Sequence, residues 1–263
     1  MVRIVRLTAL VLAVSTIAAC DFATGGAAGY AVGVGAFPTN QSGAVYSAAP
    51  AIGFYRVTGA AFINTNVLRD TCFETVYRDP TDVVPTATLI NAGEYITLSL
   101  GARTDTLRRS TLADPYYRLS TGQSIPYQPG DSMIVNIPGD PNGFPASTFR
   151  GRTAEAFTIG DIVPPEPGSD MPVTWTPAAG DGAAMLMAFR FSTDTVTSTF
   201  NRQVACTFID DGSAVLPGQV GFNWAAATHR DVVAQRLRSI LEQVNVPRSY
   251  FNLTSYFERS VVP

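Results

Sequence analysis

Few residues in this 263-residue chain could carry enzymatic chemistry. The chain has a single histidine, His229, and all of its 18 basic residues are arginine, so Schiff-base chemistry, which requires a lysine, is excluded. A Ser-His-Asp triad would have to use His229, but the sequence has no Gly-x-Ser-x-Gly elbow and no neighbour of this histidine indicates a role. We therefore expect His229 in an exposed turn or helix cap. One imidazole also cannot build a histidine-rich metal site.

Carboxylates offer a second route to chemistry, because glycoside hydrolysis needs a pair of them and no histidine. Glu74, Glu94 and Asp131 lie in ordinary strand and turn contexts, and nothing in their spacing places two of them across a sugar. The sequence therefore predicts no catalytic residue and no cofactor.

Two acidic turns could supply oxygen ligands for calcium. They contain Asp140 with Asn142 and Asp210 with Asp211. Neither matches the twelve-residue loop that ends in a bidentate glutamate, and turns of this kind form for backbone reasons alone. We predict turns without a metal.

The first 19 residues have the anatomy of a signal peptide. Arg3 and Arg6 form a positive region, and residues 7–19 form an apolar run that ends on small side chains. The run is shorter than the roughly 20 apolar residues that a membrane-spanning helix needs. We expect export and removal of residues 1–19.

The cysteine that follows has a specific context. Ile17-Ala18-Ala19-Cys20 resembles the lipobox of bacterial lipoproteins, with an aliphatic residue, two small residues and then the cysteine. The alternative is an ordinary secretory signal cut near Ala18-Ala19. The resemblance implies that Cys20 carries diacylglycerol and holds the protein on a membrane outside the cytoplasm; several acyl chains anchor stably where one does not.

Cys72 and Cys206 remain once Cys20 is set aside, and in an exported protein the simplest interpretation is one disulfide between them. The alternative is two separately buried thiols, because free cysteine is a commonly buried residue.

Composition describes the body behind the anchor. The whole chain has 46% hydrophobic and 15% charged residues, which predicts a folded domain behind the anchor. Removal of Arg3 and Arg6 leaves 16 arginines against 21 acidic residues, a formal charge of −5. With no basic cluster, nucleic acid is not an expected partner.

Segments rich in glycine or proline divide the chain into a tether, two β modules and a linker. We expect a lipidated Gly/Ala/Ser-rich tether over residues 20–50, although Tyr30-Ala31-Val32 could pair as an edge strand. A first β module over residues 51–162, a proline-rich linker over residues 163–172 and a second β module over residues 173–263 follow.

Short alternating runs between turn residues predict a mainly β fold of two antiparallel β-sandwiches. Residues 96–100 and 133–137 have the period of two that is typical of half-buried strands. The stretch from Trp175 through Cys206 to Ser213 resembles the Ig-like modules of uncharacterised extracytoplasmic lipoproteins, a resemblance that implies a fold and no activity.

Residues 231–245 allow two interpretations. Val233, Leu237, Ile240 and Val244 lie on one helical stripe, which favours an amphipathic helix. The Ig-like resemblance instead implies a long strand that pairs with the alternating tail of residues 250–257. We favour the helix and expect the tail to end the sheet.

Three functions are compatible with these observations. Our first choice is a noncatalytic envelope lipoprotein whose loops bind a protein or a glycan, with Tyr116-Tyr117-Arg118 as an exposed or buried candidate patch. The others are a structural or assembly subunit held by strand pairing and a hydrolase with an unrecognised site.

Overall fold

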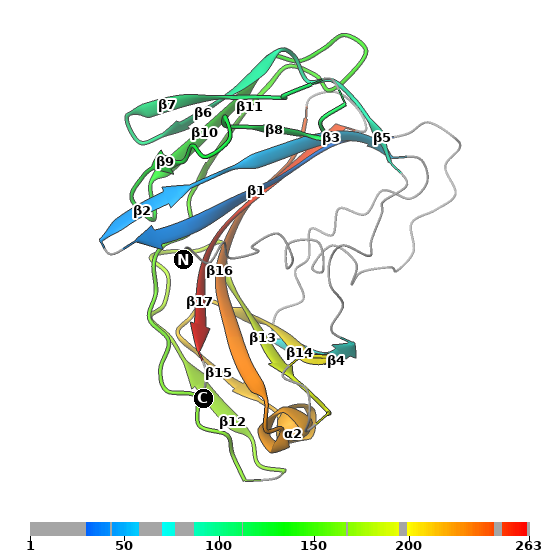
Figure 1. The fold of residues 1–263 in the computed structure, drawn as a ribbon. Coiled ribbons are helices and arrows are strands. Elements are labelled where there is room, and N and C mark those ends of the chain that lie inside the picture. The colour runs from blue at the N-terminus through cyan, green and yellow to red at the C-terminus, as the bar shows by residue number, and fades with distance from the viewer. Residues whose placement is uncertain are drawn as a thin grey trace. The chain divides into compact units, whose positions relative to one another are not determined.

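The computed structural model describes residues 30–42, 44–57, 70–76, 87–111, 113–166, 168–194, 199–244 and 249–261. The segment predicted to be a signal peptide, residues 1–19, and Cys20 lie outside the described residues. The predicted mainly β class is confirmed, with a large sheet, a small two-stranded sheet and one helix in the described part of the chain (Figure 1). The described chain divides into two compact units, each of which draws on separated stretches of sequence.

Unit 1 contains described residues up to 57, residues 87–153 and residues 239–255. Its strands are β1 (Tyr30–Ser42), β2 (Val45–Ala48), β3 (Ala51–Val57), β5 (Thr88–Leu89), β6 (Tyr95–Leu100), β7 (Arg103–Arg108), β8 (Tyr116–Arg118), β9 (Ile125–Pro126), β10 (Ser132–Ile137) and β11 (Ser147–Arg152). They pair in the order β11-β10-β6-β7-β8-β3-β1, and β2, β5 and β9 attach beside this path. The runs at residues 96–100 and 133–137 are strands, as their alternation predicted, and the structure pairs them as neighbours.

Alternation along these strands separates a core face from an outer face. Ile96, Leu98 and Leu100 are buried on the core face together with Met133 and Val135 of the paired strand. The residues between them face outward. A strand sends successive side chains to opposite faces, so the same alternation shows which side chains of the site described below lie on the outer face.

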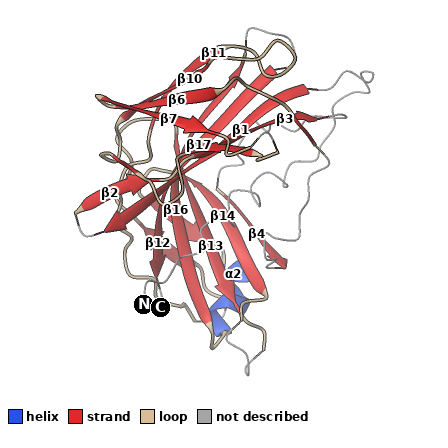
Figure 2. Cartoon of the chain, turned by 45° about the horizontal axis from the view of Figure 1, so that its top comes forward, coloured by secondary structure: helices blue, strands red, loops and turns tan. Residues whose placement is uncertain are grey.

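Unit 2 contains residues 70–76, 154–238 and 256–261 of the described chain. Its elements are β4 (Thr71–Val76), β12 (Met171–Thr174), β13 (Ala183–Phe191), β14 (Arg202–Ile209), β15 (Ser213–Leu216) and the helix α2 (Gly218–Ala226) (Figure 1 and Figure 2). β13 pairs with β14, β14 pairs with β4, and β12 pairs with β15 in the small sheet. Trp224 of α2 packs edge-on against Phe189 of β13 with 5.3 Å between ring centroids.

Two long strands, β16 (Arg230–Gln243) and β17 (Ser249–Val261), contribute residues to both units. The helix predicted for residues 231–245 is wrong, because β16 is a strand and pairs with β13 along residues 230–238. The tail does end in a strand, β17, as expected. Since this hairpin serves both units, the units are not the two sequential modules expected from the sequence, and residues 163–172 lie within unit 2 instead of linking two modules.

The tether prediction is also wrong from residue 30 onward. β1 pairs with β3 and is next to β17 in the sheet order, so it has a strand on each side. Its glycines permit this packing: a Cβ on Gly33 would lie 2.7 Å from a ring carbon of Phe251, and one on Gly35 would lie 2.6 Å from a methyl of Leu253. Gly33 and Gly35, which contributed to the linker prediction, are therefore positions where large core side chains lie against the backbone.

Candidate functional site

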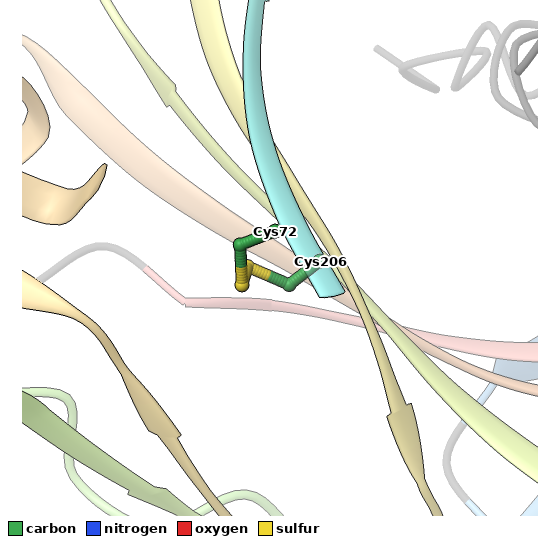
Figure 3. Close-up of a disulfide and its surroundings, with 2 residues drawn as sticks. All are labelled: Cys72 and Cys206. Atoms are coloured by element: carbon green, nitrogen blue, oxygen red, sulfur yellow. A yellow bond between two sulfur atoms is a disulfide. The ribbon is translucent and has the colours of Figure 1, made fainter. Parts of the chain in front are cut away.

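Cys72 and Cys206 form a disulfide in unit 2, as the simplest interpretation of the sequence predicted. Cys72 of β4 lies directly opposite Cys206 of β14, with 4.1 Å between their Cα atoms (Figure 3). Cys206 is fully buried. The bond clips β4 to β14, and neither sulfur is available as a nucleophile while it is formed.

The most deeply buried charges also have a structural arrangement. The Arg236 guanidinium donates to both carboxylate oxygens of Asp210, at 2.6 and 3.1 Å, and to the backbone carbonyls of Ala156 and Thr176. The indole of Trp175 donates to Asp210 at 2.7 Å. These hydrogen bonds join four separate segments of unit 2, so the cluster has a clear structural role.

The histidine and carboxylates singled out from the sequence do not come together. His229 is half-buried in the turn before β16, where its backbone carbonyl accepts from the Ser192 N–H at 3.0 Å. Glu74 accepts from the Asn223 amide at 3.0 Å, and Asp131 accepts from the backbone of Gln128 at 2.9 Å. Across the described ranges, no three His, Cys, Asp or Glu side chains are grouped as a metal site would require.

The carboxylates of the two acidic turns accept hydrogen bonds from nearby residues of the protein. Asp140 accepts from the backbone N–H of Asn142 at 2.8 Å and from the Asn91 amide at 2.7 Å. Asp211 accepts from the backbone of Ser213 at 3.2 Å, while Asp210 is taken by Arg236. Their oxygens therefore serve turn formation and ion pairing.

The Tyr116-Tyr117-Arg118 segment is β8, and its residues alternate between faces. Tyr117 is buried, accepts from the Ala92 N–H at 3.1 Å and donates to the Gly93 carbonyl at 2.7 Å. Tyr116 and Arg118 are exposed on the outer face. Both interpretations of this patch therefore hold, each for different residues.

Tyr116 and Arg118 belong to a larger outward surface of unit 1, which we call the tyrosine–arginine strip. It consists of Tyr55, Tyr95, Arg108, Tyr116 and Arg118. Arg108 of β7 lies opposite Tyr95 of β6 on one side and opposite Arg118 of β8 on the other. Tyr95 and Tyr116 are 39% and 36% exposed as residues, so this face of the sheet carries tyrosines that solvent reaches.

Tyr55 lies against the sheet. A Cβ built on Gly53 would lie 2.7 Å from the Tyr55 hydroxyl and 2.8 Å from its ring, so the ring passes over the glycine in place of a side chain there. The hydroxyl is hydrogen-bonded to Tyr116, which lies opposite Gly53 on the next strand. Burial, followed by the proximity of Tyr116 and that hydrogen bond, raises the pKa of Tyr55. Tyr55 therefore stays a neutral phenol with a fixed ring.

The arginines fix the other two rings. The Arg108 guanidinium lies 5.0 Å from the centre of the Tyr95 ring, and that of Arg118 lies 5.7 Å from the Tyr116 ring. Glu94 holds Arg108 at 3.0 Å and Asp114 holds Arg118 at 2.6 Å.

Asp114 is itself ordered at the end of the strip. Hydrogen bonds from the Ser110 hydroxyl, the Arg118 guanidinium and the Tyr116 N–H lower the pKa of its carboxyl. It is therefore a constant negative charge that positions Arg118.

Short polar side chains continue the outer face beside the strip. They form a row across four strands, which we call the polar ladder: Thr106, Thr97, Asn136 and Thr148. The Thr148 hydroxyl donates to Asn136 at 2.8 Å, and the Asn136 amide donates to Thr97 at 3.3 Å. The outer face thus combines flat aromatic surface with a low floor of hydrogen-bonding groups.

Comparisons with protein-family models, curated proteins and solved structures find no match to this chain. None of the helices in the described part of the chain is long and apolar enough to cross a membrane.

Tyr55, Tyr95 and Arg108 are the strip residues that sequence reasoning missed. Tyr95 begins the alternating run of residues 95–100, and Gly101, at a φ of +55°, gives the turn from which Arg103–Arg108 returns. That hairpin places Tyr95 and Arg108 opposite each other. For Tyr55, the only signal in the sequence is its alternation with Phe54 and Arg56, which places its side chain on the outer face of β3.

Proposed function

We propose that this chain is a lipid-anchored protein of the bacterial cell envelope whose β body binds an extended glycan, without catalysis, on the tyrosine–arginine strip. The observation that carries the proposal is three tyrosine rings held on one outward sheet face by arginine stacking and a tyrosine–tyrosine hydrogen bond. Anchoring rests on the lipobox-like Ile17-Ala18-Ala19-Cys20.

The chemistry of the strip suits sugars. A sugar ring presents C–H groups on its flat faces, and these pack on the electron-rich face of an aromatic ring. Tyr116 and Tyr95 are on β8 and β6, about 10 Å apart across the strands and about 7 Å apart along them, a separation that a short oligosaccharide can span. The polar ladder beside them offers hydroxyl and amide groups to the hydroxyls that such a ligand presents at its edges.

The strip also favours binding over turnover. The two carboxylates next to the strip, Glu94 and Asp114, are each engaged with an arginine. They precede β6 and β8, which run in the same direction because each is antiparallel to β7, so both acids lie at the same edge of the sheet. A glycosidase needs two carboxyl groups placed on either side of one glycosidic bond. Recognition groups placed on strands are held more rigidly than groups on loops, so little order has to be gained on binding.

The test uses full-length protein, purified in detergent from bacterial membranes, on a panel of cell-wall and capsular polysaccharides. We expect retention of at least one polysaccharide, and a loss of about tenfold in affinity when Tyr95→Ala is combined with Tyr116→Ala. Phe222→Ala removes an aromatic ring that is 45% exposed in unit 2 and should leave binding unchanged. No retention of any polysaccharide, or capture of an envelope protein through the same rings, would overturn the glycan proposal.

Anchoring is tested on the same preparation by intact mass beside a Cys20→Ala variant. The proposal expects a chain that begins at Cys20 with added acyl mass, and a variant that lacks this mass. An unmodified Cys20 would refute the anchor and leave the glycan proposal to its own test.

A further inference from the structure

We infer that the glycan is an acidic polysaccharide that bears carboxylate groups, an inference that rests on the proposed function. It comes from the distribution of charge over the outer face of unit 1, beyond the strip itself. The mature chain has a formal charge of −5, so a face with the opposite sign is a local feature with a specific cause.

Outward strand positions from β11 to β8 carry four arginines and no acidic residue. Arg150 and Arg152 face outward on β11. The residues that alternate with them face the core, because Phe149 is buried and Gly151 packs against Ile240. They lie opposite Ile134 and Ser132 of β10. Arg108 and Arg118 complete the set, and the acids that hold them, Glu94 and Asp114, lie outside the bounds of the strands.

The β11 arginines are the unneutralised charges of this face. Within the described ranges, the ion pairs of the molecule include Arg108 and Arg118 but neither Arg150 nor Arg152. The Arg152 guanidinium donates through Nε to the Gly130 carbonyl at 3.1 Å, which orients it and leaves its two terminal nitrogens for a ligand. Arginine presents a planar fork that matches a carboxylate.

The spacing of the arginines indicates a polymer. β11 and β7 are separated by three strand spacings, about 14 Å, with the polar ladder between them. A compact phosphate headgroup would need cations that converge on one point. Cations spread over several sugar lengths instead match a chain with a single negative charge on each of several residues, as in a polymer of uronic acids.

The experiment compares polymers that differ only in charge. Full-length protein in neutral detergent is titrated with polygalacturonate and alginate, with carboxyl-reduced forms of both, and with dextran. We expect affinity for the two polyuronates to exceed that for their reduced forms by at least about tenfold and to fall as NaCl is raised, because surface charge attraction is screened by salt.

Variants separate charge from stacking. Arg150→Ala combined with Arg152→Ala should weaken polyuronate binding by about tenfold and leave residual binding to the reduced polymers unchanged. Tyr95→Ala should weaken both kinds of polymer. Arg202→Ala, which removes an exposed arginine of unit 2, should change neither.

The outcomes distinguish the two proposals. Equal affinity for charged and reduced polymers, lost in the tyrosine variant, overturns the acidic ligand and supports the glycan function. Absence of binding to all of these polymers and to the wider polysaccharide panel overturns both. Polyuronate binding that survives the loss of Arg150 and Arg152 overturns the assignment of these arginines.

Discussion

The Arg236 guanidinium and the Asp210 carboxylate form a doubly hydrogen-bonded ion pair in which the two side chains are 1% and 2% exposed. The Trp175 indole also donates to the carboxylate, and the guanidinium donates to two backbone carbonyls. A buried pair of this kind contributes little net stability compared with apolar residues, but it becomes costly when one member is removed.

Replacement of Asp210 by alanine should therefore destabilise unit 2 strongly. The variant leaves the Arg236 charge buried without its counter-ion, and we expect a loss of about 3–5 kcal/mol in the free energy of unfolding. Urea denaturation measures this loss. The matched control is Asp105→Ala, which breaks the solvent-exposed pair with Arg103 and should change the free energy of unfolding far less. Similar losses in both variants would contradict the structural role of the buried pair.

The Cys72–Cys206 disulfide should contribute to the free energy of unfolding by an amount comparable with the effect of Asp210→Ala. It closes a loop between residues that are 134 positions apart, and restriction of the unfolded chain by such a bond is typically worth about 2–5 kcal/mol. We expect Cys72→Ala combined with Cys206→Ala to lose this amount in urea denaturation. Reductant should destabilise the wild-type protein similarly and leave the double variant unaffected. A wild-type protein insensitive to reductant under unfolding conditions would show that the bond is absent.

Gly53 tests whether the position of Tyr55 matters for binding. A Cβ at this residue would lie 2.9 Å from the Pro115 backbone carbonyl as well as against the Tyr55 ring. Because the ring moves more easily than the backbone, Gly53→Ala should displace Tyr55 and break its hydrogen bond to Tyr116. We expect glycan affinity to fall by about tenfold and the pKa of Tyr55 to return toward its usual value, measured by phenolate absorbance.

Tyr55→Phe is the matched variant for that test. It keeps the ring over Gly53 and removes only the hydroxyl, so binding should weaken by less than in Gly53→Ala. If Gly53→Ala binds the glycan as tightly as the wild-type protein, the Tyr55 ring is not part of the binding surface.

Sequence patterns predicted the half-buried strands of unit 1 because one face of each is apolar and the other is polar. The same logic failed for β16. Val232, Val233 and Ala234 are buried in succession, followed by Gln235 and the ion-paired Arg236. A strand that is covered on both faces loses its period of two, and the apolar residues that remained matched a helical stripe by coincidence.

The candidate site, too, could be predicted only in part from the sequence. Tyr116 could be singled out because it lies in an aromatic and basic triplet, but its partners depend on pairing between strands that are distant in sequence. Tyr55 and Tyr116 are 61 positions apart and meet only because β3 pairs with β8. Local spacing predicts hairpin neighbours such as Tyr95 and Arg108, whereas contacts across non-consecutive strands require the fold.

Glu155 and Arg238 give unit 2 a dependence on acid. The guanidinium donates to both carboxylate oxygens, at 2.7 and 2.8 Å. Burial raises the pKa of Glu155, but the hydrogen bonds and charge of Arg238 outweigh burial and lower it below its usual value of 4.5. Because the folded state then binds this proton less readily than the unfolded state, the stabilisation is fully present above about pH 4.5 and is lost as the pH falls.

Glu155→Gln removes this titration while keeping the size of the side chain. We expect the variant to be less stable by about 2–3 kcal/mol at pH 7, because Arg238 loses its counter-ion, and we expect the difference from wild type to shrink below pH 4.5. Urea unfolding at pH 7, 5.5, 4 and 3 measures this difference in stability. The titration of other acids, such as Asp114, is common to both proteins and cancels in the difference. Glu166→Gln, at an exposed position, serves as the control and should match wild type at each pH. A difference between Glu155→Gln and wild type that stays constant from pH 7 to pH 3 would show that the carboxylate charge of Glu155 does not stabilise the fold, and that its role is limited to shape and hydrogen bonding.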